Sequence, residues 1–169
     1  MHKSVLLSLL IITSLAAQAQ RFAYVDSEYI LGKLPEYEEA QKKLDAAADE
    51  WRKQIDQMYA EIEKKYQKYQ AEQFLLDEDT RMKRQKEIEQ KERDVKDFQK
   101  QKFGFEGDLF KTRQELVNPI QDKVFNAIST LAEGKGYDFI LDKSGSAHII
   151  LYASPRYDRS GDILKALGY

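Results

Sequence analysis

The feature that most constrains this chain is an apolar stripe with heptad spacing in its first half. Apolar residues recur at alternating steps of four and three from residue 44 to residue 62, in a chain of which 33% is charged. This spacing places the apolar side chains on one helix face and predicts a seam for a second helix. The stripe consists of Leu44, Ala48, Trp51, Ile55, Met58 and Ile62, and Tyr66 and Tyr69 continue it less regularly.

A second apolar stripe predicts the partner helix. It follows a polar cluster at residues 77–80, which is able to end one helix and cap the next. We expect a long antiparallel helical hairpin over residues 35–118, in which Pro35 begins the first helix and the tip lies near residues 76–80. Roughly 40 residues per arm at 1.5 Å each give an arm of about 60 Å, which is expected to project from a small body. The second stripe is Met82, Ile88, Val95, Phe98, Phe105, Leu109 and Leu116.

Two glycines, Gly104 and Gly107, lie inside the returning arm. A glycine in a helix interior costs about 1 kcal/mol relative to alanine, so their presence needs a reason. They either form a hinge between arm and body, or permit close helix contact by admitting Trp51 or a neighbouring tyrosine. If they form a hinge, we expect alanine at both positions to raise helix stability.

The remaining residues, 20–34 and 119–169, predict a small β-rich body, so the fold class is α+β. Three short strands are expected. One is an N-terminal strand over 21–25, and the other two form a β-hairpin, with strands over 137–142 and 147–153 and a turn at 143–146. So small a sheet is marginal alone and has exposed edges, which predicts burial at an oligomer interface. The candidate interface residues are Phe22, Tyr24, Phe139, Ile140, Leu141 and Ile150.

Helix signals complete the body. Ser27 is expected to cap a short helix that ends at Gly32. Pro119 is expected to kink or restart the returning helix, which should stop at residues 134–136. A last short helix is expected to open at Ser160.

Residues 1–19 have the pattern of a secretory signal peptide. Lys3 gives a basic start, residues 5–15 are almost continuously apolar, and Ala17-Gln18-Ala19 is a small-x-small cleavage site. An apolar stretch of this length is too short to span a bilayer. We expect cleavage near Ala19 and a mature chain that works in the periplasm.

Composition leaves few means of catalysis or of nucleic-acid binding. The chain has no cysteine, and His148 is the one histidine after the signal. Removing Lys3 leaves 26 basic and 29 acidic residues, a net charge of −3, which creates no strong field toward nucleic acid. We therefore expect no catalytic residues, no metal and no cofactor. An enzyme that uses strand carboxylates and His148 is the least favoured hypothesis.

Five short motifs follow one another around the charged hairpin: FAYVDS (22–27), LPEY (34–37), PIQDKV (119–124), YDFILD (137–142) and LYASP (151–155). In this order they resemble the Skp/OmpH family of periplasmic chaperones, over the whole mature chain. The resemblance implies a jellyfish-shaped homotrimer whose helical arms enclose a cavity and hold unfolded outer-membrane proteins without ATP. Better known members are strongly basic, which helps them attract anionic lipopolysaccharide. The mildly acidic charge of this chain argues against lipopolysaccharide as a partner.

Aromatic side chains on the arm are candidates for contact with an unfolded client, because they are amphipathic and adaptable. These candidates are Tyr59, Tyr66, Tyr69 and Phe74. Tyr59 lies off the main stripe, whereas Tyr66 is expected to fill the seam. A second hypothesis is a structural coiled-coil spacer or adaptor of the cell envelope that grips a folded partner. Competition by unfolded outer-membrane protein separates the two, since only a holdase is occupied by it.

Overall fold

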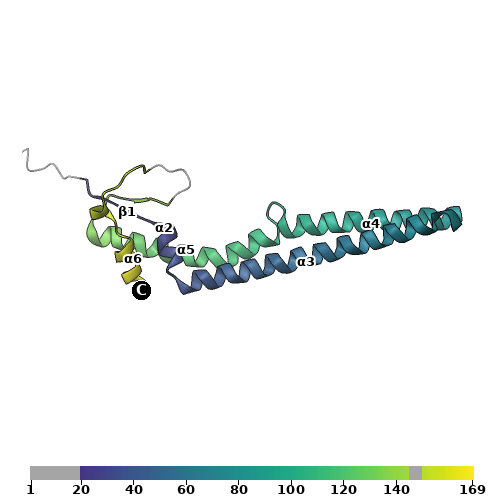
Figure 1. The fold of residues 1–169 in the computed structure, drawn as a ribbon. Helices are drawn as coiled ribbons and strands as arrows, with labels where there is room; N and C mark the ends of the chain where they lie inside the picture. Colours follow the sequence, from purple (N-terminus) through teal and green to yellow (C-terminus); the bar gives the residue numbers. More distant parts are fainter. Residues whose placement is uncertain (1–19, 145–149) are drawn as a thin grey trace, which may run out of the picture. The chain divides into compact units, whose positions relative to one another are not determined.

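The computed structural model describes residues 20–144 and 150–169 (Figure 1). The predicted signal peptide, residues 1–19, lies outside the described residues. The chain divides into two compact units. One unit is Pro35–Gln121, and the other comprises the chain before Pro35 and after Gln121.

The unit Pro35–Gln121 is built on two long antiparallel helices, α3 (Pro35–Glu72) and α4 (Glu78–Phe103), joined by a 3-10 turn, η1 (Gln73–Leu75). The two helices lie side by side in the ribbon (Figure 1). Pro35 begins α3 as predicted, because the first turn of a helix does not need the N–H that proline lacks. The Asp77 carboxylate caps α4 by accepting the backbone N–H of Thr80 at 2.8 Å. The predicted antiparallel hairpin is thus confirmed, and its tip at residues 73–77 begins a few residues before the predicted 76–80.

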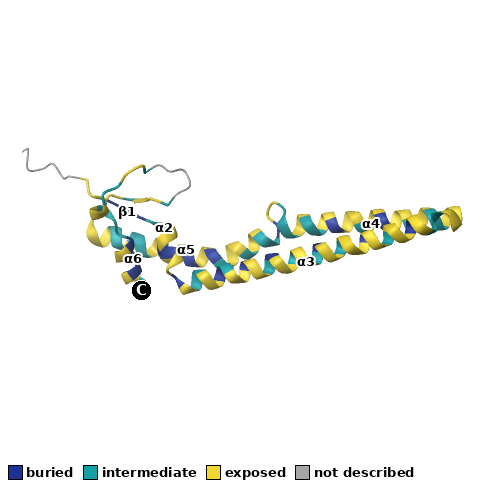
Figure 2. Cartoon of the chain, in the orientation of Figure 1, coloured by how far each residue is buried: buried dark blue, intermediate teal, exposed yellow. Residues whose placement is uncertain are grey.

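The core between α3 and α4 is thin. Its buried members are Ile55, Ile62, Tyr69, Ile88 and Val95, with Met58, Leu76, Phe98 and Phe103 packed partly against them. Ion pairs across the hairpin flank this seam, among them Lys65 with Glu87 at 2.7 Å. Figure 2 shows the buried positions of both helices as isolated turns among exposed ones. The first stripe is therefore confirmed as a seam, and Ile88, Val95 and Phe98 of the second stripe face it. Met82 and Phe105 are exposed, so the second stripe is confirmed only in part and the seam is narrow.

The returning arm is not one helix. The helix α4 ends at Phe103, and α5 (Asp108–Lys135) begins after a break of four residues. The prediction that Gly104 and Gly107 occupy a helix interior is therefore wrong. Gly104 has an extended backbone, with φ −71° and ψ 177°. Figure 1 shows the break as a small loop that stands out between α4 and α5.

The helix α5 continues through Pro119, so the expectation that this proline restarts the helix is wrong. The predicted stop is confirmed: α5 ends at Lys135, and Gly136 follows with a φ of 66°. The N–H of Tyr137 donates to the carbonyl of Ala132 at 2.9 Å. This is the Schellman ending, which favours glycine at the left-handed position.

The second unit contains a two-stranded parallel sheet. The strand β1 (Phe22–Val25) pairs with β2 (Phe139–Asp142), with Phe22 opposite Phe139. On the other side of β1, the N–H of Arg159 donates to the carbonyl of Tyr24 at 2.9 Å. Around the sheet lie α2 (Ser27–Gly32), η2 (Pro155–Tyr157) and α6 (Ser160–Ala166), and α2 contacts α6. The fully buried side chains of this unit include Ile30, Leu34 and Ile163.

The β-hairpin predicted after residue 136 is wrong within the described residues. The predicted strand at 137–142 exists, but its partner is β1, and residues 150–153 form no strand. Residues 145–149, which include half of the predicted turn and three of the seven residues of the predicted second strand, lie outside the described residues. The N–H of Lys143 donates to the carbonyl of Val25 at 2.8 Å, which extends the pairing of β2 with β1.

The short helix α2 has a different cap from the predicted one. The Asp26 carboxylate accepts the N–H of Tyr29 at 2.9 Å, whereas Ser27 is the first helical residue. Either side chain is a good helix cap. The Ser27 hydroxyl instead donates to the Asp142 carboxylate of β2, so it does not cap α2.

Candidate functional site

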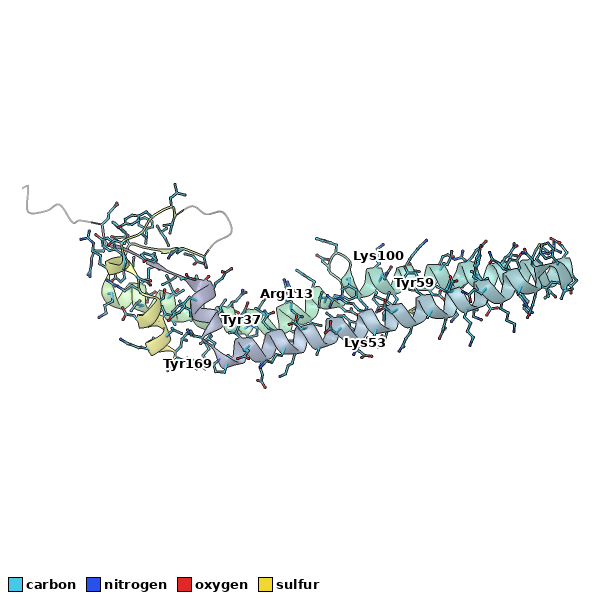
Figure 3. All side chains as sticks on the ribbon, viewed as in Figure 1. Tyr37, Lys53, Tyr59, Lys100, Arg113 and Tyr169 are labelled. Carbon is cyan, nitrogen blue, oxygen red and sulfur yellow. The ribbon has the colours of Figure 1, made fainter. Side chains whose placement is uncertain are left out.

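The aromatic residues predicted as contact sites lie at different depths of the hairpin. Tyr59 and Tyr66, both on α3, are about half exposed. The Tyr59 hydroxyl, labelled in Figure 3, donates to the Gln99 side chain at 3.4 Å. The expectation that Tyr66 fills the seam is wrong, because close to half of its surface is accessible. Both tyrosines thus combine an accessible ring with a polar hydroxyl.

Tyr69 is a core residue. It is only 8% exposed, it belongs to the buried cluster of the hairpin, and its hydroxyl accepts a hydrogen bond from Gln85 at 2.7 Å. Tyr69 therefore offers a partner little accessible surface in this hairpin, and its role as a contact site stays a prediction. The heptad stripe itself explains this position, because Tyr69 lies one heptad beyond Ile62.

The tip of the hairpin carries an exposed apolar pair. Phe74 is 88% exposed in η1, and Leu75 beside it is almost as accessible. The next residue, Leu76, turns back and packs against the hairpin core. The tip is thus held in place while two large apolar side chains face outward.

The loop between α4 and α5 is closed at its base by backbone contacts. The N–H of Gly104 donates to the carbonyl of Lys100, and the N–H of Gly107 donates to the carbonyl of Gly104, both at 2.9 Å. A Cβ at Gly104 would lie 2.3 Å from the Lys100 carbonyl oxygen, and one at Gly107 would lie 2.8 Å from the Gln101 carbonyl oxygen. The absent side chains therefore make room for backbone rather than for Trp51. Of the two interpretations of these glycines, close helix contact is wrong, and the hinge stays a prediction.

Side chains from both helices fasten the loop at its base. The Lys102 ammonium pairs with the Asp108 carboxylate across the loop at 2.6 Å, and both side chains are largely covered. The same ammonium lies 5.0 Å from the Trp51 ring centroid, within range of a cation–π interaction. The Trp51 ring meets Phe103 edge-on, with centroids 6.0 Å apart. The residues before and after the loop are thus tied to each other and to α3.

Phe105 lies in this loop and is exposed, although its spacing in the sequence predicts that it is buried. The apolar stripe places Phe105 on the buried face of the returning helix, yet its side chain is 98% exposed. The spacing from Phe98 and to Leu109 fits a helical stripe, so periodicity alone does not reveal the loop. The available signal is the pair of glycines on either side of Phe105 and Glu106, since two helix-breaking residues three apart also suit a tight turn.

The candidate interface residues of the other unit divide into two groups. Phe22, Phe139 and Leu141 are each about half exposed or more. Phe139 and Leu141 lie two residues apart on β2 and therefore project from the same face. Tyr24 is buried within the chain, so it has little surface to offer another copy, and its place in an oligomer interface stays a prediction. The remaining candidates, Ile140 and Ile150, are partly buried.

Polar contacts secure the carboxyl end of β2. The Asp142 carboxylate accepts the hydroxyls of Ser27 and Ser144 and the backbone N–H groups of both residues. Partial burial pushes the pKa of Asp142 upward, but these hydrogen bonds outweigh it and hold the pKa below its ordinary value. The cluster fastens β2 to the start of α2, and Asp142 is charged at neutral pH.

In residues 20–144 and 150–169, no cluster of three acidic, histidine or cysteine side chains is placed to hold a metal ion. No helix of the described chain has both the length and the apolar character needed to cross a membrane.

Known proteins resemble this chain over nearly its whole length. The family model described as outer membrane protein (OmpH-like) matches residues 21–167. The chaperone protein Skp of Yersinia enterocolitica is 28% identical over 159 residues, which cover 94% of this chain and 93% of that protein. The chaperone protein Skp of Pectobacterium atrosepticum is 26% identical over 161 residues, with the same coverage of both chains.

A solved structure shares the fold. The crystal structure of an OmpH-like protein from Caulobacter crescentus CB15 superposes with a TM-score of 0.71, covering 90% of this chain and 86% of the other, at 10% sequence identity. At that identity the likeness concerns the fold alone. Because the family model spans almost all of the sequence, and the helical hairpin with its small sheet accompanies it, this chain belongs to the OmpH-like family.

Proposed function

We propose that this protein is an ATP-independent holdase that binds unfolded outer-membrane β-barrel proteins in the periplasm and prevents their aggregation. One observation carries the proposal: the chain belongs to the OmpH-like family and is similar over nearly its full length to chaperones named Skp. These chaperone relatives indicate a non-enzymatic role. The signal peptide predicted for residues 1–19 accounts for export to the periplasm.

The chemistry of the client fits the surface of the hairpin. A barrel strand alternates apolar and polar side chains and, before folding, exposes unpaired backbone groups that aggregate readily. A holdase without an energy source needs only preferential binding to the unfolded chain. Tyr59, Tyr66 and Phe74 offer such a client exposed aromatic surface, and the first two add hydroxyl groups. The break at residues 104–107 interrupts the arm and serves, in this proposal, as its hinge.

We also propose that the protein works as a homo-oligomer, a trimer as the family resemblance implies. The sheet has two short strands, which is marginal for independent stability. The exposed side chains of Phe22, Phe139 and Leu141 lie on that sheet, and covering them with other copies would bury apolar surface. Ile140 and Ile150 would contribute less, because each is already partly buried within the chain.

The test is aggregation of a urea-denatured outer-membrane barrel protein after dilution, followed by light scattering. We expect residues 20–169, added without ATP, to suppress scattering at near-stoichiometric ratios and to appear in a soluble complex with the client. Serum albumin at equal mass concentration controls for generic protein effects. Scattering that rises equally with either protein would contradict the proposal.

A further inference from the structure

Phe105 is the most exposed large apolar side chain of the described residues, at 98%. Two residues earlier, Phe103 packs against Trp51 and joins the hairpin core. Phe103 thus contributes to the packing of the hairpin, whereas Phe105 packs against nothing in the described chain. An aromatic side chain carries about 150–250 Å² of surface, so contact with a partner at Phe105 would remove a large apolar area from water.

The loop is built to keep Phe105 outside. Both of its ends are fixed, by the N–H of Gly107 on the Gly104 carbonyl and by the Lys102–Asp108 ion pair at 2.6 Å. Glu106 has a φ of 53°, a left-handed backbone that is uncommon for residues other than glycine. Gly107 is buried, and the N–H of Lys111 donates to its carbonyl to begin α5. Exposure of Phe105 therefore follows from a closed turn with defined contacts.

A groove lies at the same end of α4. It has a volume of about 460 Å³ and is lined by Arg52, Ile55, Asp56, Gln99 and Phe103. Its walls combine apolar side chains with a cationic, an anionic and an amide group. These polar groups suit the unpaired N–H and carbonyl groups of an extended strand, while Ile55 and Phe103 suit its apolar side chains. Lys100, labelled in Figure 3, marks the last turns of α4 before the loop.

We propose that Phe105, with the groove beside Phe103, is a contact site for extended apolar segments of unfolded outer-membrane barrel proteins. This inference rests on the proposed holdase function and names a site for it. The available area decides the kind of partner. A stable interface between folded proteins needs about 800 Å² on each side, and one aromatic side chain supplies at most about 250 Å². A strand with an apolar residue at every second position meets a single aromatic in many registers, so weak contact suffices.

The first experiment compares client affinity among three variants with that of the whole mature protein. We expect Phe105→Ala to weaken binding of a urea-diluted barrel protein about tenfold or more, as expected when the side chain of one phenylalanine is no longer buried. Phe105→Leu should retain most of the affinity. Phe110→Ala is the matched control, because Phe110 is an exposed phenylalanine on the adjacent helix. Fluorescence of Trp51, the only tryptophan, verifies that the base of the loop is intact.

The second experiment identifies the occupant by placing a photo-crosslinking phenylalanine analogue at position 105. An adduct with the barrel protein supports the proposal, whereas an adduct between two copies of this chain overturns it. If Phe105→Ala binds the client with wild-type affinity, the proposed site is also overturned, while the holdase function is not. A wild-type protein that binds no unfolded client would defeat the holdase function, and this inference with it.

Discussion

Replacing Gly104 with alanine should destabilise the hairpin unit, although its place in the sequence predicts the opposite. In a helix interior, this substitution would stabilise by about 1 kcal/mol. In the structure, the added methyl would lie 2.3 Å from the Lys100 carbonyl oxygen and 3.1 Å from its carbon. Both atoms belong to the backbone of α4, so the overlap is relieved only by moving the helix end or the loop. Overpacking of this kind typically costs about 1–3 kcal/mol, which exceeds the gain in helix propensity.

Urea unfolding measures the free energy of unfolding of the wild type and of Gly104→Ala. Trp51 fluorescence reports on the loop base, and circular dichroism reports on the helices. Gly134→Ala is the matched control. Gly134 lies within α5, and a Cβ there would meet nothing within 4 Å beyond its own helical turn, so alanine should stabilise by up to about 1 kcal/mol. If Gly104→Ala raised the free energy of unfolding as Gly134→Ala does, residues 104–107 would be helical in solution and the reasoning would fail.

Three further outcomes are expected. Ile88→Ala should cost about 2 kcal/mol of unfolding free energy in urea titrations, since it empties part of a thin core; Met82→Ala, at an exposed position, should stay within about 0.5 kcal/mol. Because the pKa of Asp142 is held below its ordinary value of 3.8, its stabilisation is complete above that pH and is lost as the pH falls through the lower folded-state pKa. Asp142→Asn should therefore flatten the acid limb of a stability–pH profile, and an unchanged limb would exclude this role. Phe139→Asp and Leu141→Asp should each dissociate the oligomer in light-scattering mass measurements at micromolar concentration, and persistence of the oligomer in both would refute the proposed interface.

The helical hairpin is predictable because its signal is local. Spacings of three and four residues report directly on one helix face, and Ile55 and Ile62 are buried where the stripe predicts. Asp77 caps the start of α4, because its short acidic side chain accepts the free N–H of Thr80 a few residues later. The loop at 104–107 is not predictable in the same way, because Phe105 fits the helical period. The contacts that hold Phe105 outside depend on backbone closure and on the Lys102–Asp108 pair.

The partners of the strands and the burial of the interface candidates could not be predicted from the sequence. The short apolar run in residues 137–142 predicts a strand but not its partner, and the nearest strand-like segment in the sequence is not the one it pairs with. β2 pairs with β1, more than a hundred residues earlier, with Phe22 opposite Phe139 and Val25 opposite Asp142. The interface candidates also depend on packing that the sequence does not reveal: Tyr24 on β1 is buried, whereas Phe139 and Leu141 on the paired strand β2 are half exposed or more.

The most direct measurement of the central claim is a competition for bound client. A labelled, unfolded barrel protein is held by residues 20–169 and challenged with the same barrel protein, unlabelled, either unfolded or already folded in detergent micelles. The holdase account predicts that the unfolded competitor displaces the label at equimolar concentration, whereas the folded competitor does not at tenfold excess. Displacement by the folded barrel, or binding that the unfolded competitor leaves unchanged, would contradict the account and favour an adaptor that grips a folded partner.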